Sequence, residues 1–450
     1  MGDAVGLPGS FFVQRMFFCY DIPTMSPIVT IEKLVFGGQG FARLNGKAIF
    51  VWNALPDEEV EIEYIKNKKD YAEAIATKII RSSPERREPK DAHFLSTSPW
   101  QIVSYDKENQ WKKEIAMETY KKIGGNIFEN INPDIIFPTE EYRYRNKMEF
   151  SFFQKEDSTF SLAFFNRGGK QKFPIQKSEL AQDCINTTAQ KILNWVNKQN
   201  LERKNLKTLI VRSDTEGKTI AALFIKDELN FKDYPVLDDT LIGFQLYYST
   251  HKSPASVPTR LLYSIGQDYL IETLHNTKLK LGLLSFFQVH APIFEHALAD
   301  ISEHTDNNTD LIDFYSGVGS IGLPLAKKHT HITLVDNNDE AIHYANENIK
   351  LNNLKNCEAY CVPAEKITDI ITSNKTIILD PPRAGLHEDV IKKLLEATPP
   401  KIIYLSCNLS TQARDIQMLS SKYHITFSRL YNFFPRTPHI EGLVVLSCNV

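Results

Sequence analysis

The sequence has no long hydrophobic run, little excess charge and few cysteines. No stretch approaches the ~20 consecutive apolar residues of a membrane-spanning helix, so the chain is not predicted to cross a bilayer. Its 52 lysine and arginine residues nearly balance 55 aspartate and glutamate residues, giving a net charge of -3. This excludes a polycation, so a nucleic-acid partner would have to bind to local basic patches. The six cysteines form no CxxC pair, which argues against a disulfide framework and predicts a reducing compartment, the cytoplasm.

The length and composition are those of a multidomain globular protein. A chain of 450 residues is too long for one ordinary core and should divide into two or three domains. Residues 1–25 contain an apolar stretch interrupted by Gln14 and Arg15, which does not have the form of a signal peptide. We therefore expect residues 1–25 to be a disordered leader, or the result of a start assigned too early, with Met25 the true one.

Residues 26–82 have the pattern of a small β-barrel. Short stretches of alternating apolar and polar residues are separated by turns rich in glycine, asparagine and aspartate. The stretches Gly38 to Arg43 and Leu55 to Val60 resemble the TRAM domain, a small OB-like barrel found on several RNA-modifying enzymes. The resemblance implies RNA binding, whereas the strand pattern alone also allows a barrel used for protein contacts.

Residues 90–285 follow a charged, proline-containing linker and should form a central α+β domain. A helix is predicted from about Tyr105 to Ile123, because Gly124 and Gly125 follow it. Later segments have the pattern of strands. Basic residues lie among the tyrosines and phenylalanines of this domain: Arg143, Arg145, Lys147, Arg167, Lys170 and Lys172. Such a mixture can stack bases and hold phosphates, so we expect RNA binding; a half-buried sheet with solvated charges is the alternative.

From Leu311 the pattern changes to alternating strands and helices, which predicts that the last domain, residues 286–450, has an α/β fold with a doubly wound, Rossmann-like parallel sheet. The predicted strands are 311–314, 332–335, 376–379 and 401–407, and the predicted helices are 320–328, 338–351 and 387–397. Ligands bind at the carboxyl ends of such strands, so Cys407 should lie on the floor of a site. Taken alone, such a cysteine is more often a small apolar residue of the core.

Two other strand ends indicate a cofactor with a ribose. A glycine-rich turn, 313–322, joins a strand to a helix, and Asp336 follows the next strand, where a carboxylate can hold ribose hydroxyls. Nicotinamide enzymes share such a glycine run, but Asp313, which stands where their first glycine is expected, favours S-adenosylmethionine. Asp380 is followed by two prolines that would hold it rigidly over the same crevice. Asp-Pro-Pro also occurs as a purely structural turn.

Several motifs together resemble the RNA uracil-5-methyltransferases, which form 5-methyluridine in transfer or ribosomal RNA. These motifs are Tyr315 to Gly319, Asp380 to Gly385, Ser406 to Asn408 and Phe434 to Glu441. The resemblance covers nearly the whole chain from residue 26. It implies an S-adenosylmethionine-dependent methyltransferase sheet and RNA as the partner. A monomer is expected, because the chain would carry its own RNA-binding domains.

The resemblance also implies roles for individual residues. Carbon 5 of uracil is a poor nucleophile, so a thiolate must first add to carbon 6. Cys407 matches that thiolate, and Glu441 matches the base that removes the proton from carbon 5. The residues that match the cofactor site are Gln288, Tyr315, Gly317, Asp336 and Asp380.

The chain departs from the family at several positions. Many members carry cysteines for an iron-sulfur cluster just after the barrel, where residues 93–101 contain no cysteine. Cys184 matches one further cluster ligand, but a single thiolate cannot hold a cluster that needs four, so we expect none. Leu409 replaces a common proline and Ser320 a common asparagine. Neither change removes a reacting group.

Other functions are compatible with parts of this pattern. Methylation of a purine amino group can use Asp-Pro-Pro without covalent catalysis and would need neither Cys407 nor Glu441. RNA cytosine-5 methylation would need a cysteine just after the Asp-x-Pro loop, where Arg383 stands. A catalytically silent RNA-binding protein would use only the barrel and the basic patches, but the intact candidate residues argue against it.

Overall fold

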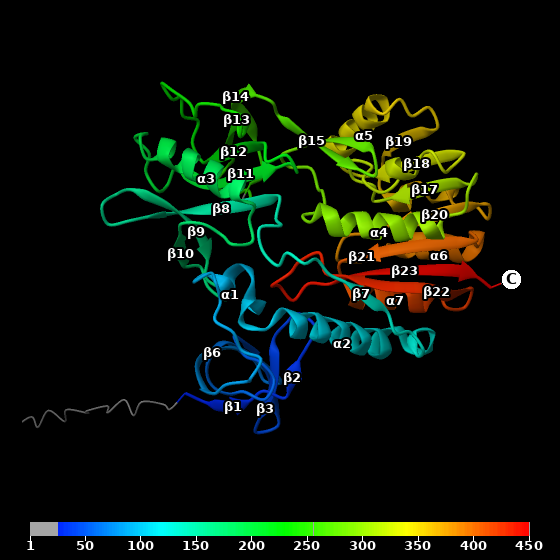
Figure 1. Ribbon diagram of the computed structural model, residues 1–450, viewed down its shortest axis with the longest axis horizontal. Coiled ribbons are helices and arrows are strands. Elements are labelled where there is room, and N and C mark those ends of the chain that lie inside the picture. The colour runs from blue at the N-terminus through cyan, green and yellow to red at the C-terminus, as the bar shows by residue number, and fades with distance from the viewer. Residues whose placement is uncertain (1–25, 255, 450) are drawn as a thin grey trace, which may run out of the picture.

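The computed structural model describes residues 26–254 and 256–449, so the expected leader, residues 1–25, lies outside the described residues. Figure 1 shows a barrel (blue), a middle domain (green) and a C-terminal α/β domain (yellow to red). A long helix (cyan) lies between the barrel and the α/β domain. Within the described residues, no helix is long and apolar enough to cross a membrane.

The barrel is a six-stranded sheet in the order β1-β5-β6-β4-β3-β2. Its strands are β1 (Ile28–Thr30), β2 (Lys33–Leu34), β3 (Gly40–Leu44), β4 (Lys47–Trp52), β5 (Glu59–Asn67) and β6 (Tyr71–Arg81). Successive side chains of a strand face opposite sides, and Ile49, Val51, Val60 and Ile62 are buried in one core. The alternation in the sequence therefore separates the core side of the barrel from its solvent side.

The linker after the barrel is held by a buried carboxylate. Glu58 is fully buried and accepts hydrogen bonds from Arg86 Nε at 2.6 Å and Arg86 Nη2 at 2.7 Å. The helices that follow are α1 (Phe94–Thr97), η1 (Pro99–Ile102), α2 (Tyr105–Gly124) and η2 (Gly125–Phe128). Helix α2 ends where the glycine pair predicts, with Gly125 at a φ of 62°.

The middle domain is a seven-stranded sheet in the order β10-β9-β8-β11-β12-β13-β14, with one helix packed on it. The elements are β8 (Lys147–Gln154), β9 (Phe160–Phe165), β10 (Lys172–Ile175), α3 (Asp183–Val196), β11 (Leu206–Ser213), β12 (Thr219–Ile225), β13 (Leu241–Tyr248) and β14 (Arg260–Gly266). Ile185 and Ile192 of α3 pack in the same core as Phe150 and Leu209 of the sheet. A hairpin of β15 (Tyr269–Leu274) and β16 (Thr277–Gly282) leads to the α/β domain.

The α/β domain contains an eight-stranded sheet in the order β19-β18-β17-β20-β21-β23-β22-β7. Its strands are β7 (Asp134–Ile136), β17 (Asp310–Phe314), β18 (His331–Asp336), β19 (Cys357–Cys361), β20 (Lys375–Leu379), β21 (Lys401–Ser406), β22 (Tyr423–Tyr431) and β23 (Glu441–Cys448). Strands β17 to β21 are parallel, and β23 runs antiparallel to β21. The doubly wound sheet predicted from the sequence is confirmed, although its last predicted strand ends one residue earlier, at Ser406.

Helices cover both faces of this sheet, which explains why its central strands contain continuous apolar runs such as Ile377 to Leu379 and Ile402 to Leu405. The helices are α4 (Ala291–His304), α5 (Asp339–Leu351), α6 (Glu388–Ala397) and α7 (Leu409–Leu419). Helices α4 and α5 share a core with Ile378 and Ile403, whereas α2, α6 and α7 share the opposite core with Ile377 and Ile402. The sheet is therefore enclosed between two apolar layers.

The helix predicted over 320–328 is wrong. The chain there forms turns and one short 3₁₀ helix, η3 (Leu323–Leu325). The amide of Leu325 donates to Gly322 O at 3.0 Å and that of Ala326 to Leu323 O at 3.1 Å, which is 3₁₀ rather than α-helical bonding. Pro324 has no amide hydrogen to donate to an α-helical ladder.

One segment of the range 90–285 belongs structurally to the C-terminal sheet. Strand β7 pairs in parallel with β22, opposing Arg429 to Asp134 and Tyr431 to Ile136. Helix α2 packs Ala116 and Tyr120 into the core beneath the sheet. Residues 105–136 therefore connect the barrel and the middle domain to the edge and underside of the α/β domain (Figure 1).

Candidate active site

The strand register brings the two predicted reacting residues together. Ser406, the last residue of β21, is opposite Gly442 of β23. Cys407 directly follows β21 and Glu441 is the first residue of β23, so both lie at this end of the antiparallel pair, close enough for the charge of Glu441 to raise the pKa of the Cys407 thiol. Asp380 directly follows β20, whose Leu379 pairs with Tyr404 of β21. A thiol and two carboxyl groups therefore meet at the ends of three neighbouring strands.

Burial raises the pKa values of all three groups in this cluster, and the negative charges of the carboxylates raise those of Cys407 and Glu441 further. The pKa of Cys407 is raised to about 11, first by burial and then by the carboxylates of Glu441 and Asp380, while Arg383 opposes this rise. The pKa values of Glu441 and Asp380 are also raised, by burial in both cases and, for Glu441, by the charge of Asp380. Glu441 Oε2 is buried and has no hydrogen-bond partner among the described residues. A carboxylate oxygen is thus available to a substrate beside the thiol.

The neighbouring strand ends form the predicted cofactor edge. The amide of Gly317 donates to Asp336 Oδ2 at 2.9 Å, which ties the glycine turn to the end of β18. Gly317 has a φ of 55° and open space where a Cβ would stand, so its backbone faces room for a ligand. Tyr315 also has a positive φ, 63°, and directly follows Phe314, whose carbonyl accepts from the amide of Asp380 at 3.4 Å. Tyr315, Gly317, Asp336 and Asp380 therefore lie along one edge.

A buried carboxyl group supports the glycine turn from below. Asp313 Oδ2 accepts from the amide of Gly322 at 2.8 Å, whereas Asp313 Oδ1 has no partner among the described residues. Burial, with smaller contributions from Asp380 and Asp336, raises the pKa of Asp313 to about 8. Ser316 Oγ is another buried polar atom without a partner in the described chain. Open space, acceptors and an unused hydroxyl suit the ribose and amino-acid parts of S-adenosylmethionine.

The segment that contains Gln288 approaches this region from another direction. It is buried on the segment between β16 and α4, and its carbonyl accepts from Asn146 Nδ2 at 3.0 Å. The same segment contacts the start of α5, since Ser285 Oγ donates to Glu340 Oε1 at 2.9 Å. This places the segment beside the helix that follows Asp336. Its neighbour Phe286 is 70% exposed.

The loop before Glu441 is held in place by buried charged residues of α2. These residues were not predicted from the sequence. Lys112 Nζ lies 2.8 Å from Glu108 Oε1 and donates to Asn432 Oδ1 at 2.7 Å and to the carbonyl of Phe434 at 3.1 Å. The amide of Arg436 donates to Glu108 Oε1 at 2.9 Å. Burial lowers the pKa of Lys112 to about 8, although Glu108 opposes that change. The contacts that join α2 to this loop link residues more than 300 positions apart in the sequence, so no local pattern could reveal them.

A small cavity of about 140 Å³ adjoins the thiol. It is lined by Phe36, Gly37, Arg383, Cys407, Asn408, Pro438, His439 and Ile440. Burial, and then Arg383 and other nearby cations, lower the pKa of His439 to about 4, so this imidazole is neutral at pH 7. The barrel therefore contributes to the wall of the candidate active site, which the sequence analysis also missed.

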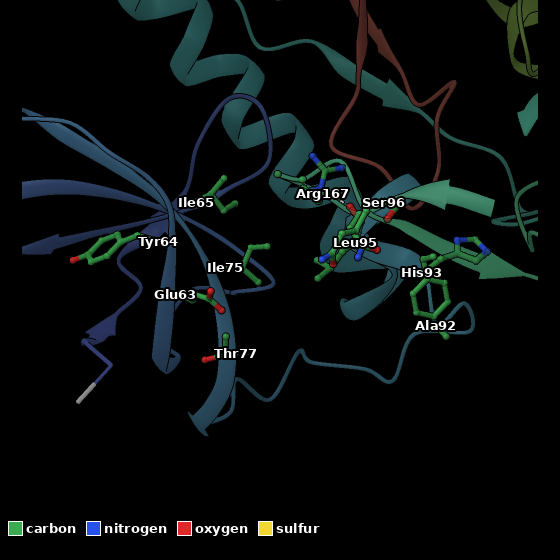
Figure 2. Close-up of a pocket in the computed structure, with 15 residues that line it drawn as sticks. Glu63, Tyr64, Ile65, Ile75, Thr77, Ala92, His93, Leu95, Ser96 and Arg167 are labelled. Atoms are coloured by element: carbon green, nitrogen blue, oxygen red, sulfur yellow. Dashed lines mark hydrogen bonds between the residues drawn. The ribbon is translucent and has the colours of Figure 1, made fainter. Parts of the chain in front are cut away.

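A larger cavity, of about 530 Å³, lies between the barrel and the middle domain (Figure 2). Glu63, Ile65, Ile75 and Thr77 of the barrel face Leu95, Ser96 and Arg167 across it. Arg167 stacks on Trp52, with its guanidinium carbon 3.9 Å from the ring centre, and so joins the two domains. None of the predicted catalytic or cofactor residues lines this cavity, so the chemistry is not expected there.

Comparison with known proteins identifies the family. The model of the tRNA (uracil-5-)-methyltransferase family matches residues 112–449, and that of the TRAM domain matches residues 28–77. The chain belongs to the tRNA (uracil-5-)-methyltransferase family. The resemblance drawn from the sequence motifs is confirmed, and with it the TRAM domain. The protein is an S-adenosylmethionine-dependent RNA methyltransferase that acts on carbon 5 of uracil.

Other proteins match this family member over nearly its whole length. A protein of Aquifex aeolicus named "Uncharacterized RNA methyltransferase" is 30% identical over 431 residues, covering 93% of this chain and 97% of the relative. One from Fusobacterium nucleatum is 28% identical, covering 92% and 95%. The tRNA (uracil-54, C5)-methyltransferase of Pyrococcus abyssi, solved with S-adenosyl-L-homocysteine, superposes with a TM-score of 0.77 at 24% identity, covering 93% of this chain and all of that one. This last likeness supports the fold.

The segment where other family members carry cluster cysteines is held by hydrogen bonds. Gln101 Nε2 donates to Asp91 Oδ2 at 2.8 Å and to Ser98 Oγ at 2.7 Å, and His93 Nε2 lies 3.3 Å from Asp91 Oδ1. Cys184 is half-buried, with its Sγ 3.7 Å from Gln182 Oε1. Among the described residues, no group of three or more histidine, cysteine or acidic side chains is placed to hold a metal ion.

Proposed function

We propose that this enzyme methylates a uridine of transfer or ribosomal RNA through a covalent bond between Cys407 and carbon 6 of the base. The observation that carries the proposal is the cluster at the strand ends, where Cys407 and Glu441 lie at adjoining ends of β21 and β23 and Glu441 Oε2 is buried without a partner among the described residues. Methylation of an amino group would need neither residue. A buried, unpaired carboxylate beside a thiol has little value for stability, which supports a catalytic role.

The first step is addition of sulfur to the base. In the free enzyme Cys407 is a thiol at neutral pH, because its pKa is about 11. Arg383 favours the thiolate, so we assign it the role of stabilising the nucleophile as Cys407 gives its proton to solvent. Bond formation between Sγ and carbon 6 moves the electron pair of the 5,6 double bond onto carbon 5 and the adjoining carbonyl.

The later steps transfer a methyl group and restore the base. S-adenosylmethionine supplies the methyl group as a positively charged sulfonium. As carbon 5 bonds to the methyl group, the bond between that methyl group and the sulfonium sulfur breaks, and the donor leaves as the neutral thioether S-adenosylhomocysteine. Carbon 5 then carries both the methyl group and a proton. Glu441 removes that proton, the 5,6 double bond forms again, and the bond between carbon 6 and Sγ breaks. Cys407 leaves as a thiolate and Glu441 keeps the proton, so the atoms and charges balance.

A trap with 5-fluorouridine-substituted RNA tests this function. Fluorine at carbon 5 cannot leave as a proton, so a methylated adduct should remain attached to Cys407 and run as a shifted band on a denaturing gel. Transfer RNA and ribosomal RNA transcripts are offered separately, and sequencing the trapped RNA identifies the uridine. Methyl transfer to ordinary RNA without a trapped band would contradict the covalent mechanism and favour methylation of an amino group.

The RNA should also contact a basic depression of about 630 Å³ on the middle domain. Its lining includes Lys172, Arg203, Lys204 and Lys226, against a single carboxylate, Glu202. Glu202 pairs with Lys204, with 2.9 Å between Nζ and Oε2. The pKa of Lys172 is lowered by burial and by the positive charges of Lys226 and Arg203, so these three cations lie close together. Phosphates of an RNA backbone would relieve that repulsion.

We predict that the double variant Arg203→Glu, Lys204→Glu binds RNA roughly 10-fold or more weakly, because two phosphate contacts are lost. For the same reason, the slope of log K against log salt concentration should become smaller in magnitude by about 1 to 2. Titration of labelled RNA by fluorescence anisotropy at several salt concentrations measures both. The charge-matched control is Lys350→Glu, Lys392→Glu, on exposed positions of α5 and α6. An equal loss of affinity in the control would show that only net charge matters.

A further inference from the structure

A loop of the barrel forms part of the cavity that contains the catalytic thiol. Phe36 and Gly37, between β2 and β3, line the same 140 Å³ space as Cys407. This volume is below the ~300–1,000 Å³ of ordinary ligand pockets. The cavity therefore suits one base, with the ribose and phosphate outside it.

The ring of Phe36 is exposed, although the backbone that carries it is tightly held. Phe36 is 44% exposed. The amide of Gly38 donates to the carbonyl of Val35 at 2.8 Å, and that of Val35 donates to the carbonyl of Gln39 at 3.0 Å, closing a short turn around it. Phe36 is absent from the cluster of buried residues that forms the barrel core, and its ring instead lines the cavity of Cys407.

The turn is fixed against the catalytic loop as well. Trp100 Nε1 donates to the carbonyl of Gly38 at 3.0 Å, and the amide of Trp100 donates to the carbonyl of Arg436 at 3.1 Å. A Cβ on Gly38, whose φ is 92°, would stand 2.2 Å from Cβ of Pro438. The backbone of the barrel turn therefore packs directly against the side chain of Pro438, and Trp100 links it by hydrogen bonds to the loop before Glu441. Phe36 thus has a set position relative to Cys407.

Phe36 also lines a second depression, of about 250 Å³, whose wall includes Phe50, Ile115 and Ser410. Its side chain thus stands between the catalytic cavity and a groove that runs beside α2. A base has to leave its stack before Cys407 can reach carbon 6, and enzymes hold such bases against aromatic side chains. A ring at the mouth of the cavity is placed for this task.

We propose that Phe36 is a nucleobase-stacking residue that holds the extruded uridine in the cavity of Cys407. The barrel domain then has two roles, since it supplies a wall of the active site in addition to any contact with the RNA backbone. This inference rests on the proposed covalent function. It adds a residue that acts on the substrate base and not on S-adenosylmethionine.

The test compares Phe36→Ala, Phe36→Leu and Phe36→Tyr in the 5-fluorouridine trap, at RNA concentrations below saturation. Phe36→Ala should form the adduct more slowly and have a KM for RNA roughly 10-fold higher, because removing an aromatic ring from a stacked base weakens binding by about this factor. Phe36→Tyr should recover the wild-type rate, and Phe36→Leu should not. Binding of S-adenosylmethionine, measured by calorimetry, should be unchanged in all three.

The matched control is Ile80→Ala, which truncates an exposed apolar side chain of the same barrel that does not line the cavity. Its trapping rate should equal that of the wild type. A wild-type rate in Phe36→Ala would overturn the stacking role, and full recovery in Phe36→Leu would show that only apolar volume matters, which overturns it too. Absence of an adduct with the wild-type enzyme would instead overturn the covalent function itself, so the two failures are distinguishable.

Discussion

Replacing Glu441 with glutamine should make the enzyme stop with natural RNA attached to Cys407. The amide cannot accept the proton from carbon 5, so addition and methyl transfer proceed while elimination fails. We expect release of methylated RNA to fall by roughly 10²–10⁴-fold, the usual contribution of a general base. A denaturing gel of the variant with unsubstituted RNA and S-adenosylmethionine should show a protein–RNA band that the wild type does not accumulate.

The sign of the pH dependence follows from the same residue. Because burial and Asp380 raise the pKa of Glu441, the fraction of Glu441 in the carboxylate form, which can act as a base, increases with pH. Elimination by the wild type should therefore become faster as the pH rises.

The control for the Glu441→Gln variant is Glu388→Gln, an equivalent change at an exposed position of α6. The double variant Cys407→Ala, Glu441→Gln should lose the band. Product release by Glu441→Gln at the wild-type rate would mean that another group takes the proton.

Replacing Cys407 with alanine should abolish methyl transfer, with a loss of roughly 10⁴-fold or more, as when other covalent nucleophiles are removed. Without sulfur on carbon 6, carbon 5 cannot take the methyl group. Binding of S-adenosylmethionine should persist, because the candidate cofactor residues lie on the other strand ends, after β17, β18 and β20. Transfer of a tritiated methyl group measures the first effect, and calorimetry the second.

The matched control for this variant is Cys361→Ala, which removes an exposed thiol at the end of β19. It should methylate RNA at the wild-type rate. Turnover retained by Cys407→Ala would exclude covalent catalysis and leave methylation of a purine amino group as the better explanation. Loss of cofactor binding in the same variant would point to a structural fault and not to the missing nucleophile.

The candidate site was predictable from the sequence because most of it lies where strands end. Continuous apolar stretches such as 376–379 can only be buried strands, and the polar residue after each one falls at the same edge of the sheet. Asp336, Asp380 and Cys407 were found in this way. Glu441 was not, since it begins its strand and does not follow one; only the family resemblance indicated it.

The remaining features depend on contacts between distant segments. Lys112 and Glu108 look like an ordinary helical ion pair, and nothing nearby in the sequence indicates that they bind the loop before β23. From the sequence alone, Phe36 looks like an ordinary turn residue of the barrel. Only in the folded chain does it line the same cavity as Cys407. The helix expected over 320–328 failed for a local reason, since Pro324 favours 3₁₀ turns where the periodicity alone predicts an α-helix.

The pairing of β7 with β22 also bears on how this enzyme can be divided for experiments. A fragment that begins at residue 286 would lose β7 and leave one side of β22 with unpaired amides and carbonyls. Open edges of this kind pair with other chains and promote aggregation. Such a fragment would also lose α2, whose Ala116 and Tyr120 belong to the core beneath the sheet. A usable minimal enzyme should therefore retain residues 105–136, and chimeras that exchange RNA-binding domains between relatives should keep this segment with its own sheet.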